Sequence, residues 1–531
     1  MQAVYADRSV RRGAAMTGTR TEAVFGWART NATRLYAVLF VLLGGLLPLV
    51  YFRMPLHFDE ALFLVIGDQW ANGILPFTGI ADHKPPGIYF LAFLAEYVTE
   101  YPHFLMRIVT FLTVAVTALL VFVLGQRLVG RTVGMVASLC YLVATYMPHF
   151  DGFFYITEPY ANLTMVVAAI LLLEDRRAFD ALAGASLAVG VLFNQTVFLF
   201  GLAFIVFRAL LLRDPANRSR EYLLGTVSRF LVIGGGFLVP IGVTAAYFAA
   251  NGLLYEFYYY SFYLPATAYS PPFHLWGHIL AAASIAPIWL LAGLVVIQEG
   301  YRLAKGRVES EGVLFLACWA LFIGYPGATS FVGDHKLLFT FPAVGLLAAV
   351  GLHRAYHTFA AGEGTVSLFS APRRGTAGSV SLLAVVLAGF VLLSAASAGF
   401  NVYYASNVLA DDIDGEKAKV DAVAAHVHDG LVFTYPSPQS MLYYHNDSIT
   451  PVATFATVYD AATRAEMVED VERQQAKYLV VRNNHVAPDG SIYGDKDLYF
   501  KEQKAILVAY LNDNYEPFET TESWTIYRRT G

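Results

Sequence analysis

Residues 104–126 read FLMRIVTFLTVAVTALLVFVLGQ, an apolar run of the length that an α-helix needs to cross a lipid bilayer. One charged residue, Arg107, lies within it, near its start. Similar runs recur along the chain and predict eleven membrane-spanning helices. We place them at 34–52, 104–126, 132–147, 159–173, 179–193, 196–212, 229–250, 278–297, 313–328, 336–354 and 379–400.

The composition of the whole chain agrees with an integral membrane protein. Of its 531 residues, 56% are hydrophobic and only 15% are charged, which is too little charge to keep so large a chain in solution. The two cysteines, Cys140 and Cys318, lie in apolar runs, so we expect buried thiols and no disulfide. The net charge of -5, without a basic cluster that has interleaved aromatic residues, excludes a nucleic-acid partner.

The distribution of Lys and Arg predicts the orientation, because short cytoplasmic loops are enriched in both. Residues 1–33 carry arginines without an early apolar core, so we expect a cytoplasmic tail and not a signal peptide. With eleven helices, every positively charged loop falls on the cytoplasmic side. The external loops are then acidic and aromatic, at 53–103, 148–158, 251–277 and 329–335.

One step in the helix count has two interpretations. The polar pair Asn194-Gln195 interrupts the apolar region 179–212, which is either one long tilted helix or two short helices that meet there. A single helix would reverse the orientation of everything that follows. With two helices, the part of the chain after residue 400 lies outside the cell membrane.

Residues 401–531 differ from the rest, since charged residues return and apolar residues fall into short patches. We predict a small extracytoplasmic α/β domain, separate from the tail at 1–33 and the membrane module at 34–400. Its predicted strands and helices alternate. The strands are at 431–434, 478–481 and, as a pair around a turn, 517–528, and the helices are at 462–476 and 499–512.

The first external loop holds two groups of candidate functional residues. Asp59 and Glu60 follow the first helix directly, where adjacent carboxylates are costly unless they are used. The run at 61–71 is too short to span a bilayer and predicts an interfacial helix. Lys84 precedes a Pro-Pro-Gly sequence that begins a second one, and a cation beside a helix N-terminus suits phosphate.

Each of these residues also has a structural interpretation. An acidic pair such as Asp59-Glu60 often caps a helix N-terminus. Lys84 and Arg107 are also placed where long basic side chains reach from an apolar segment to the lipid headgroups. The combination of the two groups favours a functional site, because a simple helix cap needs no neighbouring Lys-Pro-Pro turn.

The external loops resemble those of family 39 and aminoarabinose-transferase-like enzymes of the GT-C glycosyltransferase superfamily. The resemblance covers most of the membrane module. The residues that carry it are Asp59-Glu60-Ala61, Gly73, Lys84-Pro85-Pro86-Gly87, Arg107, Thr157-Glu158-Pro159-Tyr160, Asn194-Gln195 and Asp334-His335-Lys336. Two positions depart from it. Asn194 stands where many relatives have Lys, and Lys336 follows His335 where an aromatic residue is frequent.

The resemblance implies a GT-C fold and inverting transfer of sugar from a polyprenyl-phosphate donor to an acceptor hydroxyl, with Asp59 as the general base. Glu60 would be secondary, and Glu158 would orient the acceptor or hold a basic residue, with helix capping as the alternative. The groups that neutralise the leaving phosphate would be Lys84, Arg107, His335 and Lys336. The scheme requires neither a metal nor another cofactor.

The expected partners are the lipid-linked donor, membrane lipids and an acceptor that is a lipid, a glycan or a protein. A transporter or lipid flippase is the main alternative. Such a protein places ionisable residues in the middle of the membrane, whereas the unusual charges of this chain lie at external helix ends. A membrane scaffold ranks last, since it needs no paired carboxylates beside a Lys-Pro-Pro turn.

Overall fold

The computed structural model describes most of the membrane module and parts of the C-terminal region. It covers 31–360 except 53, 55, 79–81, 175, 268–284, 309 and 330–333, then 399, 403, 418, 421–423, 425–426, 432–435, 477–483, 486–492, 501–521 and 524–531.

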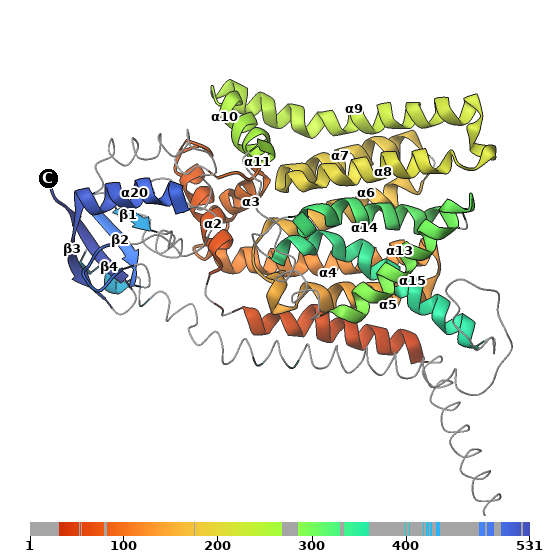
Figure 1. The fold of residues 1–531 in the computed structure, drawn as a ribbon, viewed down its shortest axis with the longest axis horizontal. Coiled ribbons are helices and arrows are strands. Elements are labelled where there is room, and N and C mark those ends of the chain that lie inside the picture. The colour runs from red at the N-terminus through yellow and green to blue at the C-terminus, as the bar shows by residue number, and fades with distance from the viewer. Residues whose placement is uncertain are drawn as a thin grey trace, which may run out of the picture.

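Long apolar helices lie side by side and form one bundle (Figure 1). The first runs over Asn31–Tyr51 and ends in a π turn and a 3-10 turn. The other long helices are α4 (Pro102–Leu128), α5 (Arg131–Thr145), α6 (Thr157–Leu172), α7 (Arg177–Phe193), α8 (Phe198–Leu211), α9 (Arg220–Ala250), α13 (Ala286–Ala304), α14 (Glu311–Thr329) and α15 (Phe341–Ala360).

The predicted spans up to residue 354 overlap these helices. Among the described residues, four helices are long and apolar enough to cross a membrane by length and composition: Asn31–Tyr51, Pro102–Leu128, Arg220–Ala250 and His335–His357. The last predicted span, 379–400, lies outside the described residues except for Gly399, so the count of eleven stays a prediction. Helix α9 begins nine residues earlier than predicted, because Ser219 caps it by accepting a hydrogen bond from the Tyr222 N–H at 3.1 Å.

Residues 179–212 form two helices. Helix α7 ends at Phe193, where Asn194 takes an extended backbone conformation. The Asn194 side chain accepts a hydrogen bond from the Thr196 N–H at 3.0 Å and so starts the short 3-10 turn η4 (Gln195–Val197) that leads into α8. An Asn side chain that accepts a hydrogen bond from the backbone two residues ahead interrupts a helix instead of continuing it.

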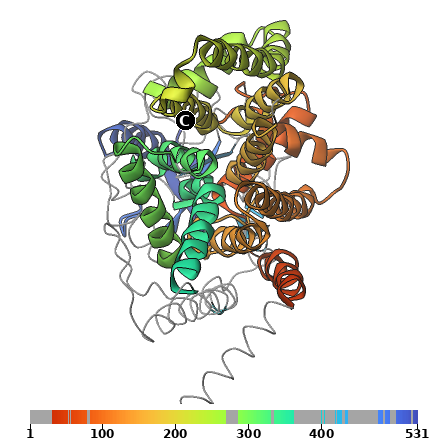
Figure 2. The same ribbon diagram turned by 90° about the vertical axis from the view of Figure 1, so that its right-hand side faces the viewer.

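Glycines allow some helices to approach backbone to backbone, as is common between membrane helices. A Cβ atom on Gly134 of α5 would lie 2.3 Å from the Phe122 carbonyl oxygen of α4. One on Gly184 of α7 would lie 1.9 Å from the carbonyl oxygen of Ile233 in α9. Figure 2 looks along the bundle and shows α9 at its rim, so this glycine contact joins a peripheral helix to the rest.

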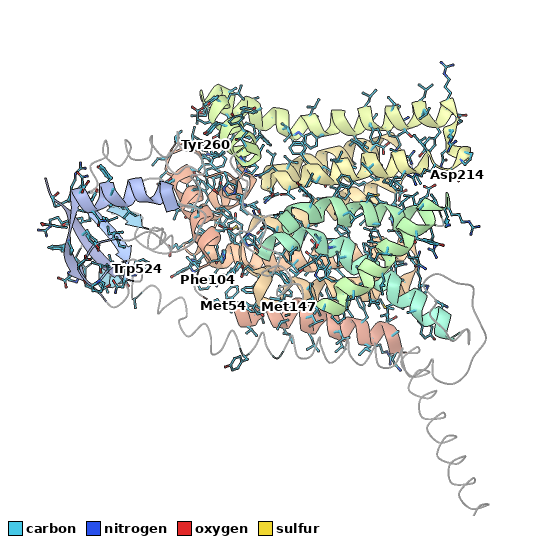
Figure 3. All side chains as sticks on the ribbon, in the orientation of Figure 1. Met54, Phe104, Met147, Asp214, Tyr260 and Trp524 are labelled. Carbon is cyan, nitrogen blue, oxygen red and sulfur yellow. The ribbon has the colours of Figure 1, made fainter. Side chains whose placement is uncertain are left out.

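Two short helices lie at one end of the bundle, α2 (Phe58–Ala71) and α3 (Gly87–Glu96), with α10 (Leu254–Tyr258), the π turn η6 (Tyr259–Tyr263) and α11 (Leu264–Thr267) at the same end (Figure 1). Figure 3 labels Tyr260 there and Asp214 at the opposite end. Helices α2 and α3 pack closely, since a Cβ on Gly67 would lie 2.4 Å from that of Ala92. They correspond to the two interfacial helices predicted in the first external loop.

The C-terminal region contains a four-stranded sheet of order β1-β2-β4-β3. Strands β1 (Val432–Tyr435) and β2 (Tyr478–Arg482) are parallel, while β4 (Trp524–Arg529) is antiparallel to β2 and to β3 (Tyr515–Thr520). Helix α20 (Lys501–Asn514) precedes β3. The predicted strands and the second predicted helix are thus present, whereas the helix predicted at 462–476 lies outside the described residues.

The two faces of the sheet have different apolar partners. Leu479, Val481 and Tyr527 pack with Leu511 of α20. Tyr478, Val480, Trp524 and Ile526 belong to one apolar cluster with residues of α2 and α3. One face of the sheet therefore shares an apolar cluster with the loop helices.

Candidate functional site

The N-terminus of α2 is fixed by a reciprocal cap. His57 Nδ1 accepts a hydrogen bond from the Asp59 N–H at 3.2 Å, and Glu60 Oε2 accepts one from the His57 N–H at 3.2 Å. Glu60 therefore helps to cap α2, which is the alternative role expected for the acidic pair Asp59-Glu60. The Asp59 side chain is half-buried at the same turn.

Glu60 also forms a buried ion pair with Arg107, which enters from the first turns of α4. The Arg107 Nε lies 2.9 Å from Glu60 Oε1, and its Nη2 lies 2.7 Å from Oε2. Arg107 Nη1 further donates to the backbone carbonyls of Phe52 and Met54 at 2.9 and 2.7 Å. Both side chains are 0% exposed, so this pair ties α2 and α4 to the end of the first helix.

The turn at 82–84 is held by a buried carboxylate. Asp82 accepts hydrogen bonds from the Tyr89 hydroxyl and from the His83 N–H. Burial alone would raise the pKa of Asp82, but hydrogen bonding and charge from His83, with Tyr89 and Lys84, hold that pKa below its usual value. The Lys84 side chain, which follows, is 6% exposed.

The Pro-Pro-Gly sequence lets α3 start against the end of α7. A Cβ on Gly87 would lie 2.6 Å from the Leu192 carbonyl oxygen, so a larger residue would push α3 away. The Tyr155 hydroxyl donates to the Ile88 carbonyl in the same turn. These contacts fix the segment that presents Lys84.

Glu158 occupies the first turn of α6 and is 1% exposed. Its Oε2 accepts a hydrogen bond from Thr157 Oγ1 at 3.1 Å, and that hydroxyl accepts one from Asn194 Nδ2 at 2.9 Å. Within the described part of the chain, Glu158 Oε1 has no hydrogen-bond partner. His335 Nε2 lies 4.0 Å from this oxygen. Asn194 thus supports Glu158 through Thr157.

His335 and Lys336 lie on the 3-10 turn η7 (Asp334–Thr340) that leads into α15. Lys84 is close enough to interact electrostatically with Glu158, His335 and Lys336, and so is Asp59. Two carboxylates, two ammonium groups and an imidazole from four separate segments thus meet at the loop end of the bundle. Glu60 and Arg107 instead face each other.

Asp151 is a site residue that was not predicted from the sequence. Its Oδ2 lies 3.7 Å from His57 Nε2 and 3.9 Å from His335 Nδ1. An isolated acid in a short external loop was the available signal, since such a charge is costly at a membrane surface. Within the described residues, no group of three or more His, Cys, Asp or Glu side chains is arranged to hold a metal ion.

Comparison with solved structures places this architecture among known folds. The structure of ArnT from Cupriavidus metallidurans bound to undecaprenyl phosphate matches with a TM-score of 0.57 and 14% identity, over 94% of this chain and 98% of that one. The archaeal oligosaccharyltransferase AglB from Archaeoglobus fulgidus, in complex with an inhibitory peptide and a dolichol-phosphate, matches with a TM-score of 0.53 and 11% identity, over 85% of this chain and 70% of that one. The chain has the GT-C fold. The fold that the resemblance of the loops implied is confirmed.

A family model agrees with the GT-C fold. Residues 83–239 match the model described as dolichyl-phosphate-mannose-protein mannosyltransferase. The matched region includes Lys84, Arg107 and Glu158, while Asp59 and Lys336 lie outside it. The arabinofuranosyltransferase AftD from Mycobacteria is also similar, with a TM-score of 0.50 and 12% identity, over 94% of this chain and 40% of that one. No curated protein matches the chain.

Proposed function

We propose that this chain is a membrane glycosyltransferase that moves a sugar from a polyprenyl-phosphate donor to an acceptor hydroxyl on the extracytoplasmic side. The observation that carries the proposal is the convergence of Asp59, Glu158, Lys84 and Lys336 beside the loop helices. Mixed charges that face one small volume at a membrane surface suit a reaction between an anionic lipid and a polar acceptor. The polyprenyl phosphates named with ArnT and AglB are of the same donor class.

The proposed chemical step is a single displacement with Asp59 as the base. Asp59 takes the proton of the acceptor hydroxyl while that oxygen attacks the anomeric carbon of the sugar. The bond from this carbon to the phosphate oxygen breaks, and its electron pair leaves with the polyprenyl phosphate. One displacement inverts the anomeric configuration. The proton then passes from Asp59 to water.

Lys84 and Lys336 are proposed to stabilise the charge that grows on the leaving phosphate. Lys84 is buried and Lys336 is half-buried, and a positive charge within protein acts more strongly than one in water. Glu158 is proposed to orient the acceptor, because one of its oxygens has no hydrogen-bond partner among the described residues. His335, which lies against Glu158, is proposed to support this carboxylate.

Glu60 and Arg107 receive a different role from the one expected from the sequence. Arg107 is fully buried and its guanidinium already donates to Glu60 and to backbone carbonyls. A lipid phosphate would have to displace these bonds. We therefore propose that the pair positions α2, which carries Asp59, and that neither residue contacts the substrate.

An assay of carrier release tests the function whichever sugar the donor carries. The purified chain in lipid nanodiscs is incubated with a panel of polyprenyl-phosphate hexoses and pentoses and with lipid, glycan and peptide acceptors. We expect enzyme-dependent release of free polyprenyl phosphate with at least one donor, together with a product of inverted anomeric configuration. Movement of donor lipid across vesicle membranes without any release would overturn the proposal and favour a flippase.

A further inference from the structure

Asp151 has an unusual backbone conformation for a residue with a side chain. It follows the 3-10 turn η3 (Pro148–Phe150) with φ 56° and ψ 16°, in the left-handed region. Of the described residues other than glycine, only Phe77 shares a positive φ. Such a conformation costs free energy for most L-residues and least for Asn and Asp, and it persists where the surrounding structure enforces it. Here the next residue, Gly152, approaches the Thr145 carbonyl too closely for a side chain.

The left-handed turn brings one carboxylate oxygen of Asp151 between two imidazoles. The same Oδ2 lies 3.7 Å from His57 Nε2 and 3.9 Å from His335 Nδ1. The two rings are 6.4 Å apart, nearly at right angles. These distances are too long for a direct hydrogen bond, but a water molecule can bridge each imidazole to Asp151, and such a bridge requires an acceptor oxygen at this place.

The cap on α2 indicates which nitrogen of the neutral His57 imidazole carries the proton. His57 Nδ1 accepts the Asp59 N–H, so this nitrogen must carry a lone pair. In a neutral imidazole the proton is then on Nε2, the nitrogen that faces Asp151. Phe154, three residues after Asp151, stacks on the same ring at 5.1 Å. The segment around Asp151 therefore holds the ring that caps the first turn of α2.

We propose that Asp151 is a positioning residue that orients Asp59 through His57 and Glu158 through His335, with Oδ2 as the shared acceptor. The inference rests on the proposed function for the role of Asp59. It links three segments far apart in the sequence: the start of α2, the turn after η3 and the start of η7. Asp151 itself need not contact either substrate.

Two substitutions distinguish the effect of the acceptor oxygen of Asp151 from the effect of its left-handed backbone conformation. Asn and Gly both tolerate the left-handed conformation, so Asp151→Asn and Asp151→Gly should fold equally well. Only Asn keeps an acceptor oxygen. We expect Asp151→Gly to lower kcat about tenfold or more with donor KM within about twofold of wild type, because misplaced catalytic groups slow the chemical step more than binding. Asp151→Asn should restore most of this loss.

Equal kcat for the two variants, whether near wild type or equally reduced, would overturn the proposal, as would a loss that appears in donor KM alone. A double-mutant cycle adds a second criterion. If Asp151 acts through His57, then His57→Gln combined with Asp151→Gly should lower kcat little more than the stronger single change. Additive losses would contradict the link.

A readout without substrate separates this inference from the proposed function. Hydrogen exchange of the backbone amides at 57–61 reports how firmly the α2 cap is held. Asp151→Gly should exchange faster there than Asp151→Asn, even if no donor in the panel is a substrate. Unchanged exchange in both variants would refute the positioning role. The expected exchange, together with no sugar transfer by wild type or variants, would instead refute only the glycosyltransferase proposal.

Discussion

Lys84 provides the residue-scale test of donor binding. Its side chain is 6% exposed and interacts with Glu158, as Lys336 does. If it binds the donor phosphate, Lys84→Met should reduce the rate of carrier release by about 10²–10³, as expected when one preorganised group that stabilises developing charge is removed. Lys84→Arg should retain more activity, because the positive charge remains. Equal activity of Lys84→Met and wild type would exclude a phosphate contact.

Arg107 should determine stability and not donor affinity. Removing one partner of a buried, hydrogen-bonded ion pair costs about 3–5 kcal/mol because the other charge stays buried. Arg107→Met should therefore lower the free energy of unfolding by this amount, while Glu60→Gln with Arg107→Met should recover part of it. Thermal unfolding in detergent measures both. A stable Arg107→Met protein with weakened binding of the polyprenyl-phosphate donor would instead show that Arg107 contacts the phosphate.

The charged side chains at the external helix ends could be predicted from the sequence, whereas their pairing could not. The sequence identified Asp59, Lys84 and Glu158 because charges at external helix ends are unusual in an apolar chain, and the structure brings these three within electrostatic range. It could not predict that Arg107 pairs with Glu60, since the partner is 47 positions away and is chosen by packing. The roles of all these residues in catalysis stay predictions.

At the element scale, the α2–α3 pair contains a carboxylate that should make stability depend on pH. Burial, and then the nearby Asp68, raise the pKa of Glu96 from 4.5 to about 7. The folded chain therefore keeps a proton between these pH values that the unfolded chain has lost, so this contribution is present below pH 4.5 and is lost as the pH rises to about 7.

Glu96→Gln should remove this dependence. The Tm of the variant should exceed that of wild type by an amount that grows from pH 5 to about pH 7 and is constant above it. Glu100→Gln is the matched control, since Glu100 is exposed just beyond α3, and it should show no such growth. A constant difference between Glu96→Gln and wild type over this pH range would show that Glu96 titrates normally.

Elements were predicted well where long apolar runs or alternating patterns marked them, as for α4 and for the strands β2 and β4. Boundaries depended on local caps. Helix α9 starts nine residues before its apolar run because Ser219 provides an N-cap, and α7 ends where the Asn194 side chain accepts a hydrogen bond from the Thr196 N–H. Hydrophobic periodicity and hydropathy do not reveal such hydrogen bonds between a side chain and the backbone.

At the scale of the whole molecule, the predicted orientation can be tested with fusions. Asp214 lies at the end of the bundle opposite Tyr260 (Figure 3), close to the arginines of the predicted cytoplasmic loops. We expect a phosphatase that is active only outside the cytoplasm to be active when fused after Tyr403. A fluorescent protein that folds only in the cytoplasm should be dark at the same position. The reverse result would mean an even number of crossings and a cytoplasmic sheet.

The most direct test of the proposed reaction compares Asp59→Asn with wild type. The amide keeps the size of the carboxylate but cannot take a proton at neutral pH, and positioned proton removal contributes about 10²–10⁴ to a rate. Carrier release from the active donor should therefore fall by that factor or more, with binding of the polyprenyl-phosphate donor and Tm unchanged. A purified Asp59→Asn protein that transfers sugar at nearly the wild-type rate would contradict the mechanism.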